Sequence, residues 1–472
     1  MSSTRLSRIW GTIPLLLTVC LCCPHLYGRI LYVDDDATGT HNGSSWENAY
    51  IYLQDALVDA NNSDKPVEIK VAQGLYRPDL GGGNVPGDRE AAFELINGVT
   101  IAAGYAGIKG NDPNSRDIEL YETILSGDLN GDDVELSISG FGWVSSRADN
   151  SYHVLLGSGA DRTAVLDGFT VTGSEENGPE LEGDDFYKDR LRCGGGMYNY
   201  EGSPTLTNCT FSGNFGGLVG GMYSYMGSAT LTHCTFSANS DGGVVGYGSD
   251  DTLTHCTFRG NFRGVTNGMG RVALTHCTFS GNHGGAVCCH GWDDSDSGLF
   301  LTNCTFTGNY DGVIWSPGWD VDPNNDAGPN LTNCILWNNM PNEIPQTSTI
   351  AYSNVQGGWE GQGNTDDDPL FANPGYWADV NDPSVVVEPD YGGTIWVDGD
   401  YHLKSSAGRW DPDSHSWVFD DVTSPCIDAG DPLSPVMYEP HPRECIINMG
   451  AYGGTKEASK SPFGCSYEAD SD

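Results

Sequence analysis

Three arginines are the only lysine or arginine residues in a long central part of this chain. Between residues 192 and 404 these are Arg259, Arg263 and Arg271. A lyase that acts on a uronic acid sugar needs a base and a cation that neutralises the carboxylate, and a guanidinium group is well shaped to hold a carboxylate. The three arginines are therefore candidate catalytic residues. The alternative is a structural pairing with nearby acids, namely Asp241, Asp250 and Asp251.

A second group of residues could bind calcium. Asp128, Asn130 and Asp132 place oxygen ligands at alternate positions, and Ca²⁺ prefers oxygen ligands. The segment is not an EF-hand loop, because Gly131 precedes Asp132 and no glutamate follows at the twelfth position. The sequence predicts these three residues as candidate Ca²⁺ ligands, with a solvated acidic turn as the alternative.

Three histidines recur at one position of a sequence repeat. They are His233, His255 and His276, and each directly precedes a cysteine. A metal-binding stack is one interpretation. Asparagine occupies the same position in other copies of the repeat, at Asn208, Asn303 and Asn333. Because asparagine tolerates the left-handed backbone conformation, the sequence favours a role in a sharp turn over metal binding.

The repeat itself must position all of these residues. Leu-Thr-Asn-Cys-Thr-Phe-Ser-Gly-Asn at 206–214 returns in altered form five times, at 231–239, 253–261, 274–282, 301–309 and 331–339. The spacings between successive repeat cysteines are 25, 22, 21, 27 and 30 residues. A constant unit separated by loops of variable length is typical of a solenoid.

The residue types within the unit predict its conformation. Leu206, Cys209 and Phe211 are apolar and alternate with threonine, so we expect them to point inward, with a corner at Asn208. Asn214 ends the unit at a second corner, where stacked asparagines can satisfy backbone groups in the neighbouring coil. Glycine pairs then open a third strand. The sequence therefore predicts an all-β fold, a single-stranded right-handed parallel β-helix with three short strands per coil.

These residues resemble known families. The spacing Phe-x-x-Asn, as at 211–214, together with Gly-Gly-Ala-Val at 284–287, is similar to the repeats of polymorphic outer membrane proteins. The whole chain resembles secreted bacterial right-handed β-helix proteins of the pectin-lyase-like fold. Tracts that carry this resemblance include 32–37, 149–154, 166–171, 424–432 and 448–454. Lyases of this fold usually use arginine or lysine as the base, but these tracts are repeat and end signatures, so the resemblance assigns no catalytic residue. By the repeat alignment Arg259 takes an outward position, which makes it the candidate base for any lyase activity.

The termini extend the prediction to domain organisation. Arg5 and Arg8 precede an apolar run, which predicts a signal peptide at 1–28, with a lipoprotein cysteine at Cys20 as the alternative. We expect an N-terminal cap and first coils at 29–95, the β-helix at 96–371 and an irregular segment at 372–472 that packs on the last coils. A capping helix from Trp46 to about Ala60 would cover the first coil.

Charge limits the partners. The chain has 64 acidic and 22 basic residues, a formal net charge of −42, so it repels nucleic acid and anionic lipid. We expect an exported protein without a transmembrane segment that binds a polysaccharide or cell-surface glycan, or serves as an adhesive or structural protein. The runner-up is a polysaccharide lyase or hydrolase acting on an acidic, uronate-containing polymer. The oligomeric state stays open, with a monomer favoured, and Ca²⁺ is the one candidate cofactor.

Overall fold

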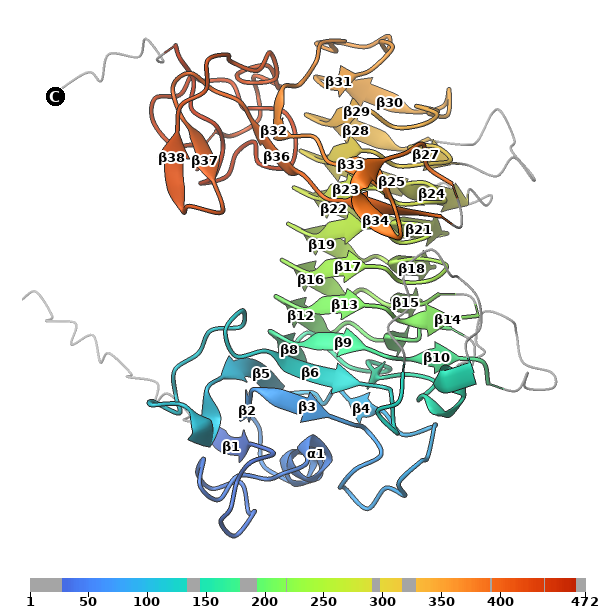
Figure 1. Ribbon diagram of the computed structural model, residues 1–472, viewed down its shortest axis with the longest axis vertical. Coiled ribbons are helices and arrows are strands. Elements are labelled where there is room, and N and C mark those ends of the chain that lie inside the picture. Colours follow the sequence, from blue (N-terminus) through green and yellow to red (C-terminus); the bar gives the residue numbers. More distant parts are fainter. Residues whose placement is uncertain are drawn as a thin grey trace, which may run out of the picture.

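The computed structural model describes residues 28–133, 145–178, 193–217, 219–290, 298–315, 328–390, 393–436 and 438–463. Most of the predicted signal peptide, including Cys20, lies outside these residues. The chain winds into a stack of coils whose strands form three long parallel sheets (Figure 1). Within the described residues, no helix is long and apolar enough to cross a membrane.

The first sheet has eleven strands and runs the length of the stack. Its strands are β1 (Arg29–Val33), β2 (Val67–Ala72), β5 (Val99–Tyr105), β8 (Val165–Asp167), β12 (Thr205–Thr207), β16 (Thr230–Thr232), β19 (Thr252–Thr254), β22 (Arg271–Thr275), β25 (Gly298–Thr302), β28 (Asn330–Thr332) and β30 (Thr349–Ala351).

The second sheet has ten strands. They are β3 (Gly74–Tyr76), β6 (Thr123–Ser126), β9 (Thr170–Thr172), β13 (Thr210–Ser212), β17 (Thr235–Ser237), β20 (Thr257–Arg259), β23 (Thr278–Ser280), β26 (Thr305–Thr307), β29 (Ile335–Trp337) and β31 (Asn354–Val355). The third sheet has eight strands. They are β4 (Phe93–Glu94), β7 (Leu155–Leu156), β11 (Met197–Tyr200), β15 (Met222–Tyr225), β18 (Val244–Tyr247), β21 (Val265–Gly268), β24 (Val287–His290) and β27 (Ile314–Trp315).

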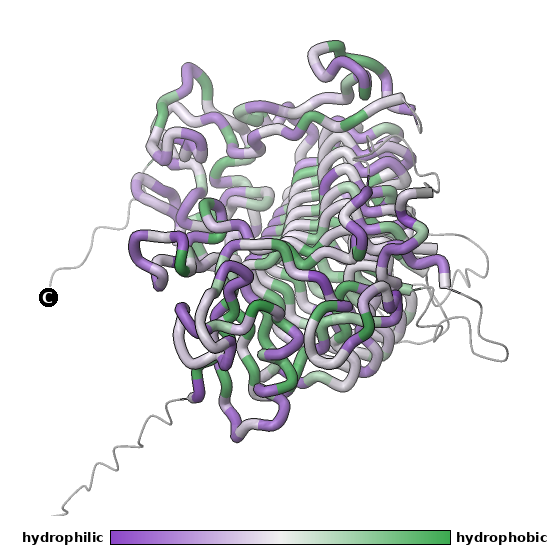
Figure 2. Tube along the Cα trace, turned by 60° about the horizontal axis from the view of Figure 1, so that its bottom comes forward, coloured by the Kyte–Doolittle hydropathy of each residue, from purple (hydrophilic) through white to green (hydrophobic). Residues whose placement is uncertain are grey.

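Identical residues stack in register from coil to coil, which confirms the predicted parallel β-helix with three strands per coil. Leu206 pairs with Leu231 in the first sheet, and Phe211 pairs with Phe236 in the second. The six repeat cysteines are buried in one inward column between the leucines and the phenylalanines. Viewed from its lower end, the chain shows residues of similar hydropathy above one another in successive coils (Figure 2).

Both predicted corners are present. The residue before each repeat cysteine has a positive φ, for example 53° at Asn208 and 55° at His276. At the second corner the asparagines form a buried ladder. Asn239 Nδ2, for example, donates to Asn261 Oδ1 in the next coil at 3.0 Å and to the backbone oxygen of Phe211 in the preceding coil at 2.9 Å. The corners thus satisfy backbone and amide groups that the stack would otherwise bury unpaired.

The predicted capping helix is shorter than expected. Helix α1 (Leu53–Asn61) covers the first coil, but it begins seven residues later than Trp46. Residues 42–50 instead form backbone hydrogen bonds with β1, including Tyr50 N to Tyr32 O at 2.9 Å. Trp46 is buried against Tyr32, with ring centroids 4.9 Å apart. The prediction of a helical start at Trp46 was wrong because packing against β1 outweighs the helical periodicity.

The C-terminal lobe, residues 371–463, lies beside the last coils (Figure 1). Its strands pair antiparallel: β32 (Phe371–Asn373) with β36 (Asp400–Leu403), β33 (Tyr376–Asp379) with β34 (Asp382–Val386) and β35 (Thr394–Val397), and β37 (Arg409–Asp411) with β38 (Ser416–Val418). Four smaller elements complete the described chain, namely the paired strands β10 (Glu175–Glu176) and β14 (Phe215–Gly216) and the 3₁₀ helices Gly107–Lys109 and Ser145–Asp149.

Candidate functional site

From β12 to β28, the outward side chains of the first sheet are uncharged with the exception of Arg271. Because Leu206 points inward, its neighbours Thr205 and Thr207 point outward, and the same alternation holds in the following strands. We define the threonine face by the twelve outward residues paired across these strands. They are Thr205, Thr207, Thr230, Thr232, Thr252, Thr254, Ala273, Thr275, Phe300, Thr302, Asn330 and Thr332.

One column of the threonine face is threonine in every coil. Thr207, Thr232, Thr254, Thr275, Thr302 and Thr332 are direct partners in successive strands. All six are partly exposed, and adjacent strands of a sheet lie about 4.8 Å apart. Each hydroxyl can donate one hydrogen bond and accept two. The column therefore presents a straight row of hydroxyl groups on a rigid support.

None of the twelve residues of the threonine face is ionisable, although the chain has 64 acidic residues. A charged side chain does lie beside the face, because Arg271 points outward from β22. Its guanidinium carbon is 4.4 Å from the ring centroid of Phe300, and its backbone N–H donates to Asp250 Oδ1 at 2.9 Å. Of the three predicted arginines, Arg271 is the one next to this surface.

The histidine corner borders the threonine face. The rings of His233 and His255 stack with centroids 4.7 Å apart, and those of His255 and His276 with centroids 4.8 Å apart. Burial, with the neighbouring His276 and His233, lowers the pKa of His255 to about 4. Burial also lowers the pKa of His276. The stacked rings do not converge on one point, which agrees with a role in the turn.

The other two predicted arginines lie away from the threonine face. Arg259, on β20 of the second sheet, has Nη1 3.5 Å from Asp398 Oδ2 of the C-terminal lobe and a side chain that is 49% exposed. Arg263 follows the asparagine corner and lies over the Phe262 ring at 5.1 Å. The three arginines therefore occupy neighbouring coils but point from different sides of the stack.

The predicted calcium ligands are brought close to a further acid. Carboxylate oxygens of Asp128, Asp132 and Asp149 all lie within 4.8 Å of one another. The backbone N–H of Asn130 donates to Asp149 Oδ2 at 3.2 Å, which holds Asp149 beside the turn. Asp128 Oδ1 accepts from the backbone N–H of Gly131 at 2.7 Å. Asp149 ends a 3₁₀ helix outside the repeats, so no spacing in the sequence predicted its place here.

An arginine–carboxylate cluster lies next to this acidic turn. Arg147 Nε is 3.9 Å from Asp133 Oδ2, and its guanidinium carbon lies 4.1 Å from the centroid of the Phe215 ring. Burial raises the pKa of the neighbouring Glu175, while the charges of Arg147 and Arg89 oppose that rise. Glu175 Oε2 is buried without a hydrogen-bond partner in the described part of the chain. This cluster could not be predicted from the sequence, because its residues come from separate irregular loops.

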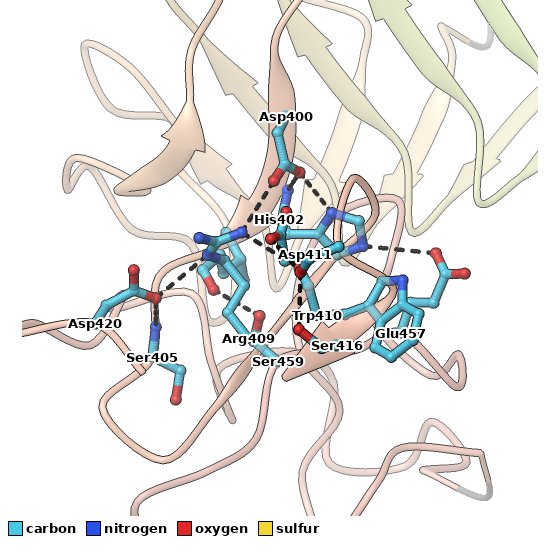
Figure 3. A network of polar contacts seen from close by, with 12 residues as sticks. Asp400, His402, Ser405, Arg409, Trp410, Asp411, Ser416, Asp420, Glu457 and Ser459 are labelled. Carbon is cyan, nitrogen blue, oxygen red and sulfur yellow. Dashed lines mark hydrogen bonds and ion pairs between the residues drawn. The ribbon is translucent and has the colours of Figure 1, made fainter. Parts of the chain in front are cut away.

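A polar network holds the C-terminal lobe together (Figure 3). His402 Nδ1 lies 2.5 Å from Asp400 Oδ1, and its Nε2 lies 3.5 Å from Glu457 Oε2. Arg409 Nη1 donates to Asp400 Oδ2 at 3.0 Å. Burial opposes protonation of His402, but hydrogen bonds with Asp400 and Glu457 outweigh it and raise the pKa of His402. His402 is only 1% exposed, so this network ties the lobe together and is closed to a ligand.

Comparisons with known proteins agree with the fold. Residues 167–326 match the family model for a right handed beta helix region, and residues 370–430 match the model described as disaggregatase related. Together with the coil topology, the first match confirms the predicted right-handed parallel β-helix. No curated protein matches the chain.

Two solved structures are similar in backbone. One is the crystal structure of pectate lyase Pel9A, with 16% identity, a TM-score of 0.46 and coverage of 90% of this chain and 96% of the other. The second is the complex of XylC with xylose, with 8% identity, a TM-score of 0.30 and coverage of 73% and 87%.

Proposed function

We propose that this protein is exported and binds an uncharged polysaccharide along the threonine face. The observation that carries the proposal is the threonine face itself, which has no acidic residue over six strands of a chain with a net charge of −42 and only Arg271 as a charged neighbour on those strands. An extended glycan offers hydroxyl groups along its length, and the column of threonines offers donors and acceptors at every coil.

The rigidity of the support favours binding. Each threonine of the column lies in a strand held by parallel pairing on both sides, so little conformational freedom is lost when a ligand binds. Phe300 adds an aromatic surface beside Arg271. The acidic remainder of the surface repels polyanions and directs the proposal towards neutral polymers.

A glycan array that contains neutral and acidic polysaccharides tests the proposal. We expect binding to neutral polymers that changes little with added salt, because uncharged hydrogen bonds are not screened. Binding restricted to polyanions, or requiring Ca²⁺, would speak against the threonine face as the binding surface.

A second candidate function is cleavage of a uronate-containing polysaccharide. It is favoured by the cluster of Arg147, Asp133 and Glu175 beside the acids of Asp128, Asp132 and Asp149, which could hold a Ca²⁺ ion. Such an elimination needs a base and a cation that neutralises the carboxylate of the substrate, and Arg147 and a Ca²⁺ ion would supply these two functions.

Absorbance of unsaturated uronate products, measured with and without Ca²⁺, tests this activity. Replacement of Arg147 by Gln should abolish it if the cluster is responsible. The combined replacement of Arg259, Arg263 and Arg271 by Gln tests the candidates proposed from sequence. Loss of turnover at an unchanged melting temperature would assign those three residues to the site, whereas a lower melting temperature with intact turnover would assign them a structural role.

A further inference from the structure

A pocket of about 620 Å³ opens at the C-terminal end of the coil stack. It lies where the second and third sheets end, beside β31 and β27, at the upper end of the stack in Figure 1. Its volume is within the range of sites that hold small organic ligands. Its lining includes Asn342, Glu343, Ile344, Gln346, Gln356 and Trp359.

One wall of the pocket is apolar. Ile344 and Trp359 are partly buried and pack against the main hydrophobic core, so the core fixes their positions. Val355, which also lines the pocket, is 1% exposed. An aromatic ring fixed in this way can pack against the apolar face of a sugar ring.

The lining also includes the amide side chains of Asn342, Gln346 and Gln356. Asn342 Nδ2 donates to Gln356 O at 2.6 Å, which fixes the orientation of the Asn342 amide. Asn342 Oδ1 is buried and has no hydrogen-bond partner in the described part of the chain. Gln356 Oε1 accepts from the Asn338 backbone N–H at 2.7 Å, which leaves the Gln356 amide hydrogens as donors. The pocket thus provides a set of donors at Gln356, and the Asn342 amide is fixed beside them.

The charge of the pocket selects its ligand. Among the described residues that line it, Glu343 is the single ionisable one, and none is lysine, arginine or histidine. The geometry points to a second binding site, one that takes a single uncharged sugar residue, stacked on Trp359 and hydrogen-bonded to the Gln356 amide. An anionic sugar is excluded by repulsion from Glu343. The pocket belongs to the second and third sheets, so it is separate from the threonine face.

Isothermal titration calorimetry of the full chain with glucose, cellobiose and glucuronate tests this site. We expect heat from the two neutral sugars and none from glucuronate. Gln356→Leu, at an exposed position, removes the amide donors at similar volume and should weaken binding about tenfold. Gln346→Ala, at an exposed position, should weaken binding without affecting folding. Thr347→Ala, an exposed neighbour outside the pocket lining, is the matched control.

The outcomes separate this site from the proposed function. Absence of heat from both neutral sugars, equal binding of glucuronate, or unchanged binding in both pocket variants would overturn the inference. Binding of a long polymer to the threonine face would persist in the pocket variants. Conversely, variants of the threonine face should bind the small sugars as the unaltered protein does, so failure of one site leaves the other measurable.

Discussion

The column of phenylalanines is the most regular part of the core. Five rings stack in successive coils with centroid separations of 4.9, 5.2, 4.8 and 4.8 Å. Phe258 is in the middle of the column and fully buried, so its neighbours cannot close the space that a smaller side chain would leave. Phe258→Ala should lower the free energy of unfolding by about 3–5 kcal/mol.

Urea denaturation measures this effect. Thr257→Ala, on the outer side of the same strand, is the control and should change stability by less than about 0.5 kcal/mol. Equal effects of the two substitutions would show that the phenylalanine column does not hold the coils together.

The histidine corner predicts a pH dependence. The pKa of His255 is about 4 in the folded protein, because of burial and of His276 and His233, whereas an unfolded histidine titrates near 6.5. Between these pH values the unfolded chain binds more protons, so the stability of the folded chain decreases as the pH falls. Glu457, whose charge favours protonation of His255, reduces the size of the effect.

His255→Asn should remove part of this dependence. Asparagine occupies the same corner at Asn208, with the same φ of 53°, so the variant should fold normally. We expect the difference in melting temperature between pH 7.5 and pH 5 to be smaller in the variant than in the unaltered protein. A difference that stays the same would show that His255 does not titrate as its surroundings indicate.

At the scale of elements, α1 is the N-terminal cap of the stack. Leu53, Ala56, Leu57 and Ala60 are buried against the first coil, and Val58 is 48% exposed. Leu53→Ala should cost about 2–5 kcal/mol of stability, and it should increase aggregation because the end of the first coil becomes accessible. Val58→Ala is the control on the same helix.

Thermal melts and light scattering compare these two variants. A Leu53→Ala protein as stable and monodisperse as Val58→Ala would mean that the first coil needs no cap.

The repeat made most of the fold predictable. Inward leucine, cysteine and phenylalanine, the histidine or asparagine corner and the Asn214 series all follow from one local unit, and the structure places each as expected. The start of α1 was not predictable, because the contact of Trp46 with β1 depends on tertiary packing.

Less of the candidate sites could be predicted from the sequence. Asp149, Arg147 and Glu175 meet through irregular loops, where no period relates their positions. The outward direction of the threonines follows from their alternation with inward residues. The exposure of this face could not be predicted from the sequence, because it depends on which sheet the C-terminal lobe covers.

At the scale of the whole molecule, the C-terminal lobe covers the second sheet at β23, β26 and β29 and leaves the first sheet open. Trp396 packs so closely on Gly281 and Gly308 that a Cβ at either glycine would lie 2.0 Å from its ring. Trp377 Nε1 donates to Gly308 O at 2.9 Å. Outward residues of the second sheet such as Thr307 are fully buried as a result.

Trp396→Ala should therefore loosen the lobe without unfolding the coils. We expect faster cleavage by protease within residues 371–463, while a fragment that contains the coils persists. Phe419→Ala, at a residue that is 74% exposed on the same lobe, is the control. Simultaneous degradation of lobe and coils in Trp396→Ala would show that the two parts fold as one unit.

Glycan binding can be compared on two faces of the same coils. Thr207, Thr232 and Thr254 lie on the threonine face, and Thr210, Thr235 and Thr257 point outward from the second sheet in the same repeats. Replacement of either set by valine removes three hydroxyl groups and preserves shape and strand preference. With a soluble neutral β-glucan as ligand, we expect the Kd to increase at least about tenfold in the first triple variant and to stay unchanged in the second. Unchanged binding in the first triple variant, or an equal loss in both, would contradict it.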